Sequence, residues 1–159
     1  MPTVNASEMI ISHDPQAILE APSIGAGIGV VVYDPIAQAG GILHFLLPDA
    51  SGLDPEKAGC FPYMFAESGM RLFLEQLYAG GMQKANLKIT VAGGAQPVNP
   101  SGISNLGQRN YETVAKILGE HGLMITRSEI GGHVARSIHL AIGSGDIQIE
   151  IRGRGARAS

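Results

Sequence analysis

The stretch Ala21-Pro22-Ser23-Ile24-Gly25-Ala26-Gly27-Ile28-Gly29-Val30-Val31-Val32-Tyr33-Asp34-Pro35 joins a turn of small residues to an apolar, valine-rich run. A short apolar run between turn residues is typical of a buried strand, so we predict one over 28–33. Pro35 ends this strand, because proline has no N–H for the ladder. A second apolar run over 41–47 predicts the next strand, and it contains His44. Two consecutive strands would place the small-residue turn beside this imidazole.

An imidazole next to a turn suits a site with a nucleophile on the turn and a base on the neighbouring strand. His44 is the candidate base, and Ser23 is the one hydroxyl that the turn offers. The glycines of the turn could instead suggest a phosphate cradle. However, the order of residues is not Gly-x-Gly-x-x-Gly, and the turn enters a strand rather than a helix N-terminus. We therefore interpret 25–29 as a close-packed turn.

The rest of the chain predicts further strands and two long helices. Phe61, Phe65, Leu72 and Leu77 recur at near-helical spacing and predict a helix over 61–78, which Gly80-Gly81 ends. A second helix is expected over 107–120 and a loop over 48–60. Further strands are expected over 86–91, 123–126, 134–142 and 147–151, with short edge strands over 9–11 and 17–19. This order favours a single-domain, layered α/β sandwich with mixed, largely antiparallel sheets and two main helices outside.

Composition limits the class of protein. The 159 residues are 45% hydrophobic and 16% charged, which fits one globular domain with a real core, expected over 1–151. A formal net charge of -3 gives no reason to expect nucleic acid as a partner. The sequence shows no signal peptide and no apolar stretch of roughly 20 residues, so a cytoplasmic protein is expected. The basic, glycine-rich tail over 152–159 is expected to be disordered.

Several blocks of sequence, spread from about residue 17 to residue 151, carry a family resemblance. They are Tyr33-Asp34-Pro35, His44 with Leu47-Pro48-Asp49, Ala92-Gly93-Gly94-Ala95, Asn105-Leu106-Gly107-Gln108-Arg109-Asn110 and Gly131-Gly132-His133-Val134-Ala135-Arg136-Ser137. In their order and spacing they resemble CheD, the chemoreceptor glutamine deamidase family of chemotaxis. The resemblance implies β-sheets packed together with helices outside. It also implies that Gly93, Gly94, Arg109 and Asn110 shape the mouth of a site, with Ser23 and Gly25 as further binding residues.

The turn departs from the family pattern. CheD proteins carry Thr-x-Gly-x-Gly-Ser-Cys here, with a cysteine nucleophile, a histidine on the next strand and an orienting threonine. In this chain the threonine position is Ala21, the cysteine position is Gly27, and only the histidine remains, as His44. Glycine has no side chain that could form the thioester intermediate of a cysteine deamidase. Because members of such a unit act together, losing two of three removes most of the rate advantage.

Three other groups could supply the missing chemistry. Cys60 is the one thiol and could replace the nucleophile only if it met the imidazole within about 3 Å. Ser23 would need stronger activation than a thiol, and water activated by His44 is the third option. His44 itself is either a packed histidine whose ring nitrogens bond to backbone or water, or the remnant of an active site. The spacing of the other histidines, including His133 and His139, predicts no metal site, and no cofactor is expected.

Two functions therefore remain open. The first is a catalytically inactive CheD-like protein that acts by binding a chemoreceptor cytoplasmic domain or a CheC-type partner, since binding energy resides in surface residues other than the thiol. The second is an active protein-glutamine deamidase that uses Cys60, Ser23 or activated water with His44. Release of ammonia from a glutamine-bearing receptor fragment would separate the two.

Overall fold

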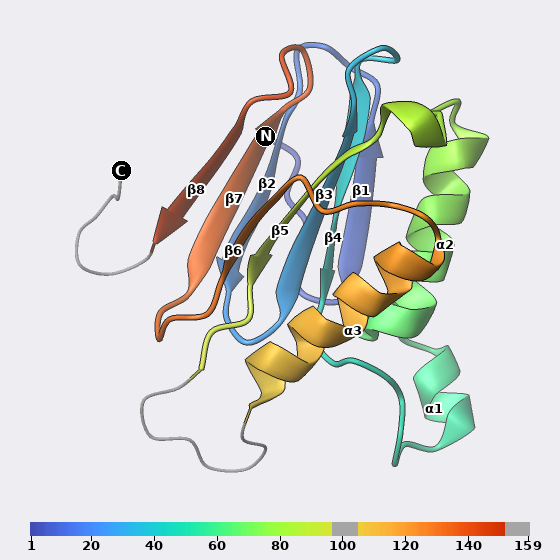
Figure 1. Cartoon of the computed structure of the whole chain (residues 1–159), viewed down its shortest axis with the longest axis vertical. Helices are drawn as coiled ribbons and strands as arrows, with labels where there is room; N and C mark the ends of the chain where they lie inside the picture. The colour runs from blue at the N-terminus through green and yellow to red at the C-terminus, as the bar shows by residue number, and fades with distance from the viewer. Residues whose placement is uncertain (97–104, 152–159) are drawn as a thin grey trace.

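Two packed sheets form the frame of the computed structural model, which describes residues 1–96 and 105–151 (Figure 1). The larger sheet has five strands in the order β1-β4-β3-β5-β6. All neighbours pair antiparallel except β5 and β6, which are parallel. The strands are β1 (Glu8–Ser12), β3 (Ile28–Asp34), β4 (Ala39–Phe45), β5 (Lys88–Gly93) and β6 (Arg127–Ile130).

The smaller sheet has three antiparallel strands in the order β2-β7-β8. They are β2 (Ile18–Ile24), β7 (Arg136–Ala141) and β8 (Ile147–Ile151). An apolar core between the two sheets includes Leu19, Ala21, Val31, Ile42 and Ile138, all with 0% exposure. Every residue of β3 and β4 is buried, because these central strands are covered on both faces.

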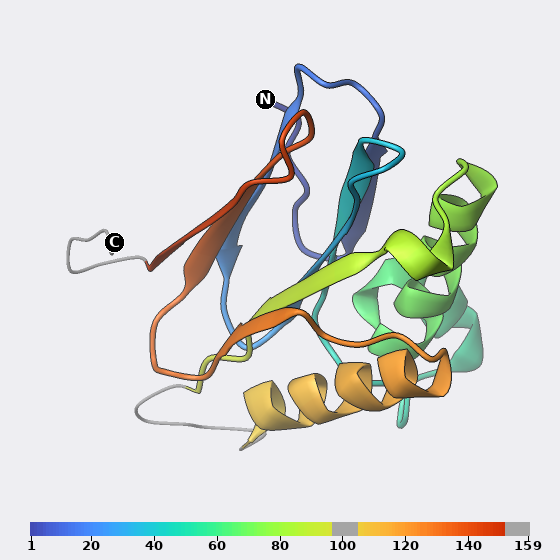
Figure 2. The same cartoon turned by 45° about the horizontal axis from the view of Figure 1, so that its top comes forward.

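Helices α2 (Ala66–Ala79) and α3 (Leu106–Glu120) cover the outer face of the larger sheet (Figure 2). The chain also forms a short helix α1 (Pro55–Gly59), which has no buried residue, and the 3-10 turns η1 (Pro62–Met64) and η2 (Lys84–Asn86). Figure 2 shows α2 and α3 on the side of this sheet that faces away from β2, β7 and β8. A second apolar core lies between the helices and the sheet, with Phe45, Phe73, Leu77 and Leu118 among its members. The layers are thus three strands, five strands and helices.

This architecture confirms the predicted layered α/β sandwich, with corrections to single elements. The predicted loop over 48–60 contains α1, which Asp54 caps by accepting a hydrogen bond from the N–H of Glu56 at 3.3 Å. The predicted helix over 61–78 starts only at Ala66, because Pro62 opens a 3-10 turn and Phe65 is extended. The predicted strand over 123–126 is wrong, and the strand of this region is Arg127–Ile130. The predicted disordered tail over 152–159 lies outside the described residues.

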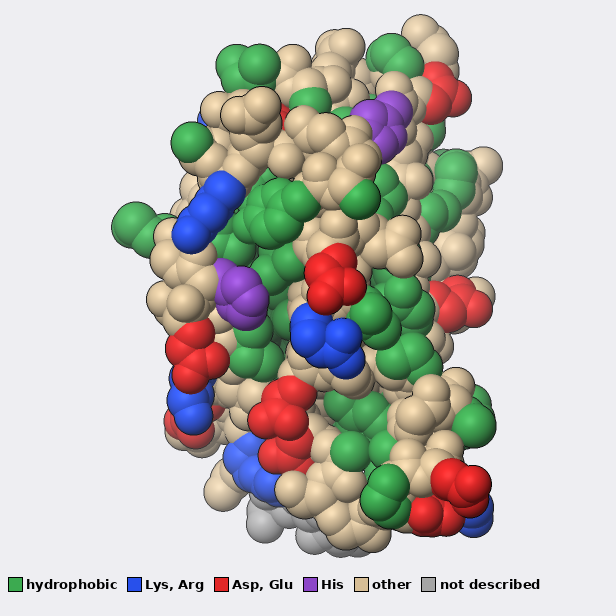
Figure 3. Space-filling view, turned by 90° about the vertical axis from the view of Figure 1, so that its right-hand side faces the viewer, with side chains coloured by type: hydrophobic (Ala, Val, Ile, Leu, Met, Phe, Trp, Pro, Cys, Tyr) green, Lys and Arg blue, Asp and Glu red, His purple; other side chains and the backbone are tan. Residues whose placement is uncertain are grey.

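The surface over α2 mixes charges of both signs. Figure 3 shows Lys and Arg side chains lying beside Asp and Glu side chains on this face, with hydrophobic side chains between them. A mixed surface of this kind creates no strong field of one sign. No helix in the described ranges is long and apolar enough to cross a membrane.

Candidate functional site

The turn between β2 and β3 and the end of β4 enclose a pocket of about 410 Å³. The antiparallel pairing of β3 with β4 brings these segments together, because Ile28 lies opposite Phe45 and Gly29 lies opposite His44. The pocket is lined by Ala6, Ser23, Gly25, Ala26, Gly27, His44, Leu46, Leu47, Met64 and Leu106. The fold therefore places the small-residue turn beside His44, as the sequence predicts.

Three hydrogen bonds hold the turn in place, one at each of its carbonyl groups. The N–H of Ala95 donates to Gly25 O at 3.0 Å, and the N–H of Gly94 donates to Gly27 O at 2.8 Å. The side-chain amide of Asn110 on α3 donates to Ala26 O at 3.0 Å and to Leu46 O at 2.8 Å. A turn with every carbonyl bonded has little freedom, so the shape of the pocket is fixed by the loop after β5 and by α3.

His44 is buried and has no polar partner within the described residues. Its side chain lines the pocket, but the residue is only 3% exposed. Neither ring nitrogen makes a hydrogen bond to any described residue. Burial lowers the pKa of His44 from 6.5 to about 4, since a low-polarity environment disfavours the charged imidazolium. The imidazole is therefore neutral at pH 7. One interpretation of the sequence expected its ring nitrogens to bond to backbone or water, and no such bond to the described backbone is present.

Position 27 faces the imidazole directly and has no room for a side chain. A Cβ added to Gly27 would lie 3.4 Å from His44 Nε2 and 3.2 Å from Leu46 Cδ2, and it would collide with the carbonyl oxygen of Phe45. Real Cβ atoms do not approach a backbone oxygen that closely, so the two strands would have to move apart. Position 27 is thus beside the histidine, where a nucleophile would be needed, and the chain is packed there for glycine.

The other predicted nucleophiles occupy different places. Cys60 is exposed at the end of α1, where its thiol donates to Glu56 O at 3.5 Å, and it does not line the pocket. Ser23 lines the pocket and has a φ of 59°, the left-handed region that favours glycine. Ala21 is fully buried in the core between the sheets and does not line the pocket. The structure therefore brings Ser23 to the pocket with His44 and leaves Cys60 outside its lining.

The residues expected at the site mouth mostly support the turn. Gly94 and Asn110 bond to it, and a Cβ at Gly93 would collide with Gly27 O. Arg109 is exposed, and its positive charge helps to lower the pKa of Asp49, after the hydrogen bonds from Ser51. Gly93, Gly94 and Asn110 thus support the turn, and neither they nor Arg109 are among the residues that line the pocket.

Sequence reasoning did not name as site residues five apolar residues of the lining, Ala6, Leu46, Leu47, Met64 and Leu106. They lie before β1, directly after β4, in η1 and at the start of α3, so no local pattern links them. It also missed Arg136, which is 8% exposed and donates from Nη1 to Gly93 O at 3.0 Å. Arg136 lies on the same face of β7 as the apolar residues Ile138 and Leu140, and that alternation could have found it.

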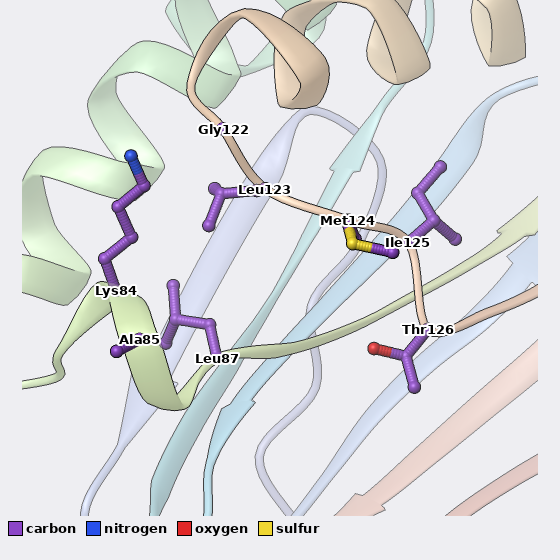
Figure 4. A pocket seen from close by; sticks show the side chains of 8 residues that line it. All are labelled: Lys84, Ala85, Leu87, Gly122, Leu123, Met124, Ile125 and Thr126. Atoms are coloured by element: carbon purple, nitrogen blue, oxygen red, sulfur yellow. The ribbon is translucent and has the colours of Figure 1, made fainter.

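A larger hollow of about 800 Å³ lies at the other end of α3 (Figure 4). Its walls are mostly apolar, with Leu87 and Leu123 on opposite sides and Lys84 at one end. None of the residues singled out from the sequence lines it. No group of three or more His, Cys, Asp or Glu residues that could hold a metal lies within residues 1–96 and 105–151. The His44 pocket is therefore the candidate site.

Comparison with known proteins assigns the family. Residues 46–151 match the family model described as CheD chemotactic sensory transduction. The chain belongs to the CheD family. A relative from Solibacter usitatus, named "Probable chemoreceptor glutamine deamidase CheD", is 34% identical over 151 residues, covering 95% of this chain and 89% of the relative. A relative from Anaeromyxobacter dehalogenans, named "Probable chemoreceptor glutamine deamidase CheD 2", is 33% identical over 93% of this chain and 92% of the relative. Another, from Clostridium novyi, is 30% identical over 98% of this chain and 95% of the relative.

Membership confirms the family that the sequence blocks resemble and gives the chain a chemotactic context. The matched segment begins two residues after His44, so the turn and the histidine lie outside it. At Ser23 the backbone is in the left-handed conformation. This conformation favours glycine, and in this chain a serine occupies the position.

Proposed function

We propose that this CheD-family chain is a catalytically inactive binding protein of the chemotaxis system, and that its His44 pocket receives a side chain from a chemoreceptor cytoplasmic segment. The observation that carries the proposal is Gly27. The position beside His44 Nε2 has no nucleophile, and the contact of a Cβ with Phe45 O leaves no room for one. The relatives named as chemoreceptor glutamine deamidases support the receptor as partner. A CheC-type protein is the alternative partner, and the cytoplasm is the expected location.

The state of His44 also favours binding over catalysis. A general base works best when its pKa lies near the operating pH, and the pKa of His44 is about 4. At pH 7 the imidazole is available as a hydrogen-bonding group, but its basicity is low. A cysteine thiolate beside it would favour the charged imidazolium, and in this chain glycine occupies that position.

A second function keeps one specific observation in its favour, because Ser23 lines the same pocket as His44. In that alternative, Ser23 or a water molecule activated by His44 attacks the amide carbon of glutamine and releases ammonia. Cys60 is disfavoured as the nucleophile, because it does not line the pocket and its thiol is bonded to Glu56 O.

One experiment tests both functions. A chemoreceptor cytoplasmic fragment with glutamine at its modification sites is titrated with the protein in a calorimeter, and ammonia is measured in the same samples. The proposal expects binding without ammonia above the buffer control. Ammonia release that disappears in Ser23→Ala, or in Cys60→Ala, would establish the deamidase instead. Absence of binding to the fragment would contradict the receptor as partner.

A further inference from the structure

Strand β8 forms a free edge of the smaller sheet. Figures 1 and 2 show β8 at the margin of the molecule, with β7 on one side and no described element on the other. The N–H of Ala141 donates to Asp146 O at 2.9 Å, so alternate residues of the ladder, from 146 onward, bond to β7. The backbone N–H and C=O groups of Ile147, Ile149 and Ile151 therefore point away from β7, toward the free edge.

The other edge of the same sheet is protected from pairing, whereas β8 is not. β2 contains Pro22, its register with β7 is irregular, and the N-terminal segment lies along it, where the N–H of Val4 donates to Glu20 O at 2.8 Å. Such features prevent an edge from pairing with another chain. β8 contains neither proline nor lysine, and its register with β7 is regular. Arg127 Nη1 donates to Ile147 O at this edge at 3.4 Å, and a carbonyl oxygen can accept a second bond.

The sequence of β8 is complementary to itself in an antiparallel pair. A two-fold axis at Ile149 places this residue opposite its own copy and Ile147 opposite Ile151, and these are the residues with outward-pointing backbone groups. The inner face of the pair then consists of isoleucine alone and covers Ile151, which is 39% exposed. On the outer face the same axis places Gln148 opposite Glu150, so an amide meets a carboxylate and no like charges lie opposite each other.

We propose that two copies of this chain associate through β8, in antiparallel register about Ile149. The two smaller sheets, each of three strands, then form one continuous sheet across the two-fold axis. The partner at this edge is a second copy of the chain, because the strand matches its own sequence in hydrogen bonding, in apolar side chains and in charge. The inference is independent of the proposed function, since no residue of β8 lines the His44 pocket.

The pair of Gln148 and Glu150 offers a charge exchange that tests this register. Both side chains are exposed on the outer face, so substitutions there leave the core unchanged. Gln148→Glu places two carboxylates opposite each other, and Gln148→Lys places an ammonium group opposite a carboxylate. Each contact occurs twice in the dimer, so we expect the first variant to raise the Kd of the dimer and the second to lower it, by about threefold to tenfold.

Two double variants separate this pairing from a general effect of net charge. Gln148→Glu with Glu150→Lys restores an attractive pair and should dimerise at least as tightly as the wild type. Gln148→Lys with Glu150→Lys raises the formal net charge from -3 by three units to zero, which favours non-specific association. It also places two ammonium groups opposite each other, so we expect it to dimerise more weakly than the wild type.

Sedimentation velocity at pH 7, from low micromolar to submillimolar protein, measures the Kd of each variant, and circular dichroism checks the fold. In the wild type, hydrogen exchange at the N–H of Ile149 should slow as the protein concentration rises. A wild type that stays monomeric over this range would overturn the inference. So would a dimer whose Kd follows net charge instead of the opposed pair, or one in which exchange at Ile149 does not depend on concentration.

Discussion

Gly27→Ala tests most directly the claim that position 27 is packed for glycine. The added methyl group would collide with the carbonyl oxygen of Phe45 and contact Leu46 Cδ2 at 3.2 Å and His44 Nε2 at 3.4 Å. The carbonyl cannot move alone, because Phe45 pairs with Ile28 in the central ladder of the larger sheet. Inserting a methyl group into a closely packed site typically costs about 1–3 kcal/mol, and the backbone contact favours the upper half of that range.

Gly25→Ala is the matched control. Gly25 belongs to the same turn, its φ is not in the left-handed region, and an added Cβ would meet nothing within 4 Å. The same substitution is therefore expected to be neutral or to stabilise by up to about 1 kcal/mol, because alanine restricts the unfolded chain. Any general effect of replacing a glycine in this turn is thus separated from the contact at position 27.

Urea unfolding at pH 7, followed by far-UV circular dichroism, measures the difference. With a slope of about 2 kcal/mol/M, a loss of about 2 kcal/mol lowers the midpoint by about 1 M. We expect that shift for Gly27→Ala and a midpoint for Gly25→Ala at or slightly above wild type. Equal midpoints for the two variants would refute the packing argument, and with it the reason for excluding a side chain beside His44.

Three further predictions concern the neighbours of the turn. The pKa of His44 is lowered to about 4, so the unfolded chain binds a proton that the folded chain rejects. About 3 kcal/mol of stability, present above pH 6.5, should therefore be lost as the pH falls to 4. In urea titrations between these two pH values, His44→Leu should lose less stability than the wild type. Asn110→Ala leaves Ala26 O and Leu46 O without their donor and should lower the free energy of unfolding by about 2–4 kcal/mol, measured by thermal or urea unfolding. The control Gln108→Ala, on the exposed face of α3, should change it by less than about 0.5 kcal/mol. Cys60→Ala should change stability by less than about 0.5 kcal/mol and should leave receptor binding in calorimetry unchanged, because the exposed thiol does not line the pocket. A loss of receptor binding in this variant would contradict the assignment of the site.

Local sequence patterns predicted the centre of the fold and the core of the site. The valine run of β3 and the apolar run of β4 are buried from end to end, so their hydrophobic pattern was unambiguous. The consecutive strands β3 and β4 pair with each other, and that placed the turn beside His44 without knowledge of the remaining strands. The pocket was therefore predictable as far as it depends on neighbours in the sequence.

The parts that sequence reasoning missed depend on long-range contacts or on exposed edges. β6 is an edge strand with two exposed residues, so its apolar signal is weaker than that of the preceding residues Leu123 to Ile125. Phe61 fits the helical spacing but is 56% exposed, because Pro62 starts a separate turn there. The role of Asn110 follows from contacts with residues 64 and 84 positions away, which no sequence window contains.

The supports of the turn explain how a pocket can persist without a reactive side chain at position 27. The donors are the backbone N–H groups of Gly94 and Ala95 and the amide of Asn110, and their acceptors are backbone carbonyls. None of these bonds involves the side chain at position 27, so the shape of the turn does not depend on a thiol. The electrostatics do depend on it, because a thiolate would hold His44 in the charged form, whereas burial alone keeps the imidazole neutral. The backbone hydrogen bonds and Asn110 therefore fix the shape of the turn around glycine at position 27, and the neutral state of His44 follows from burial alone.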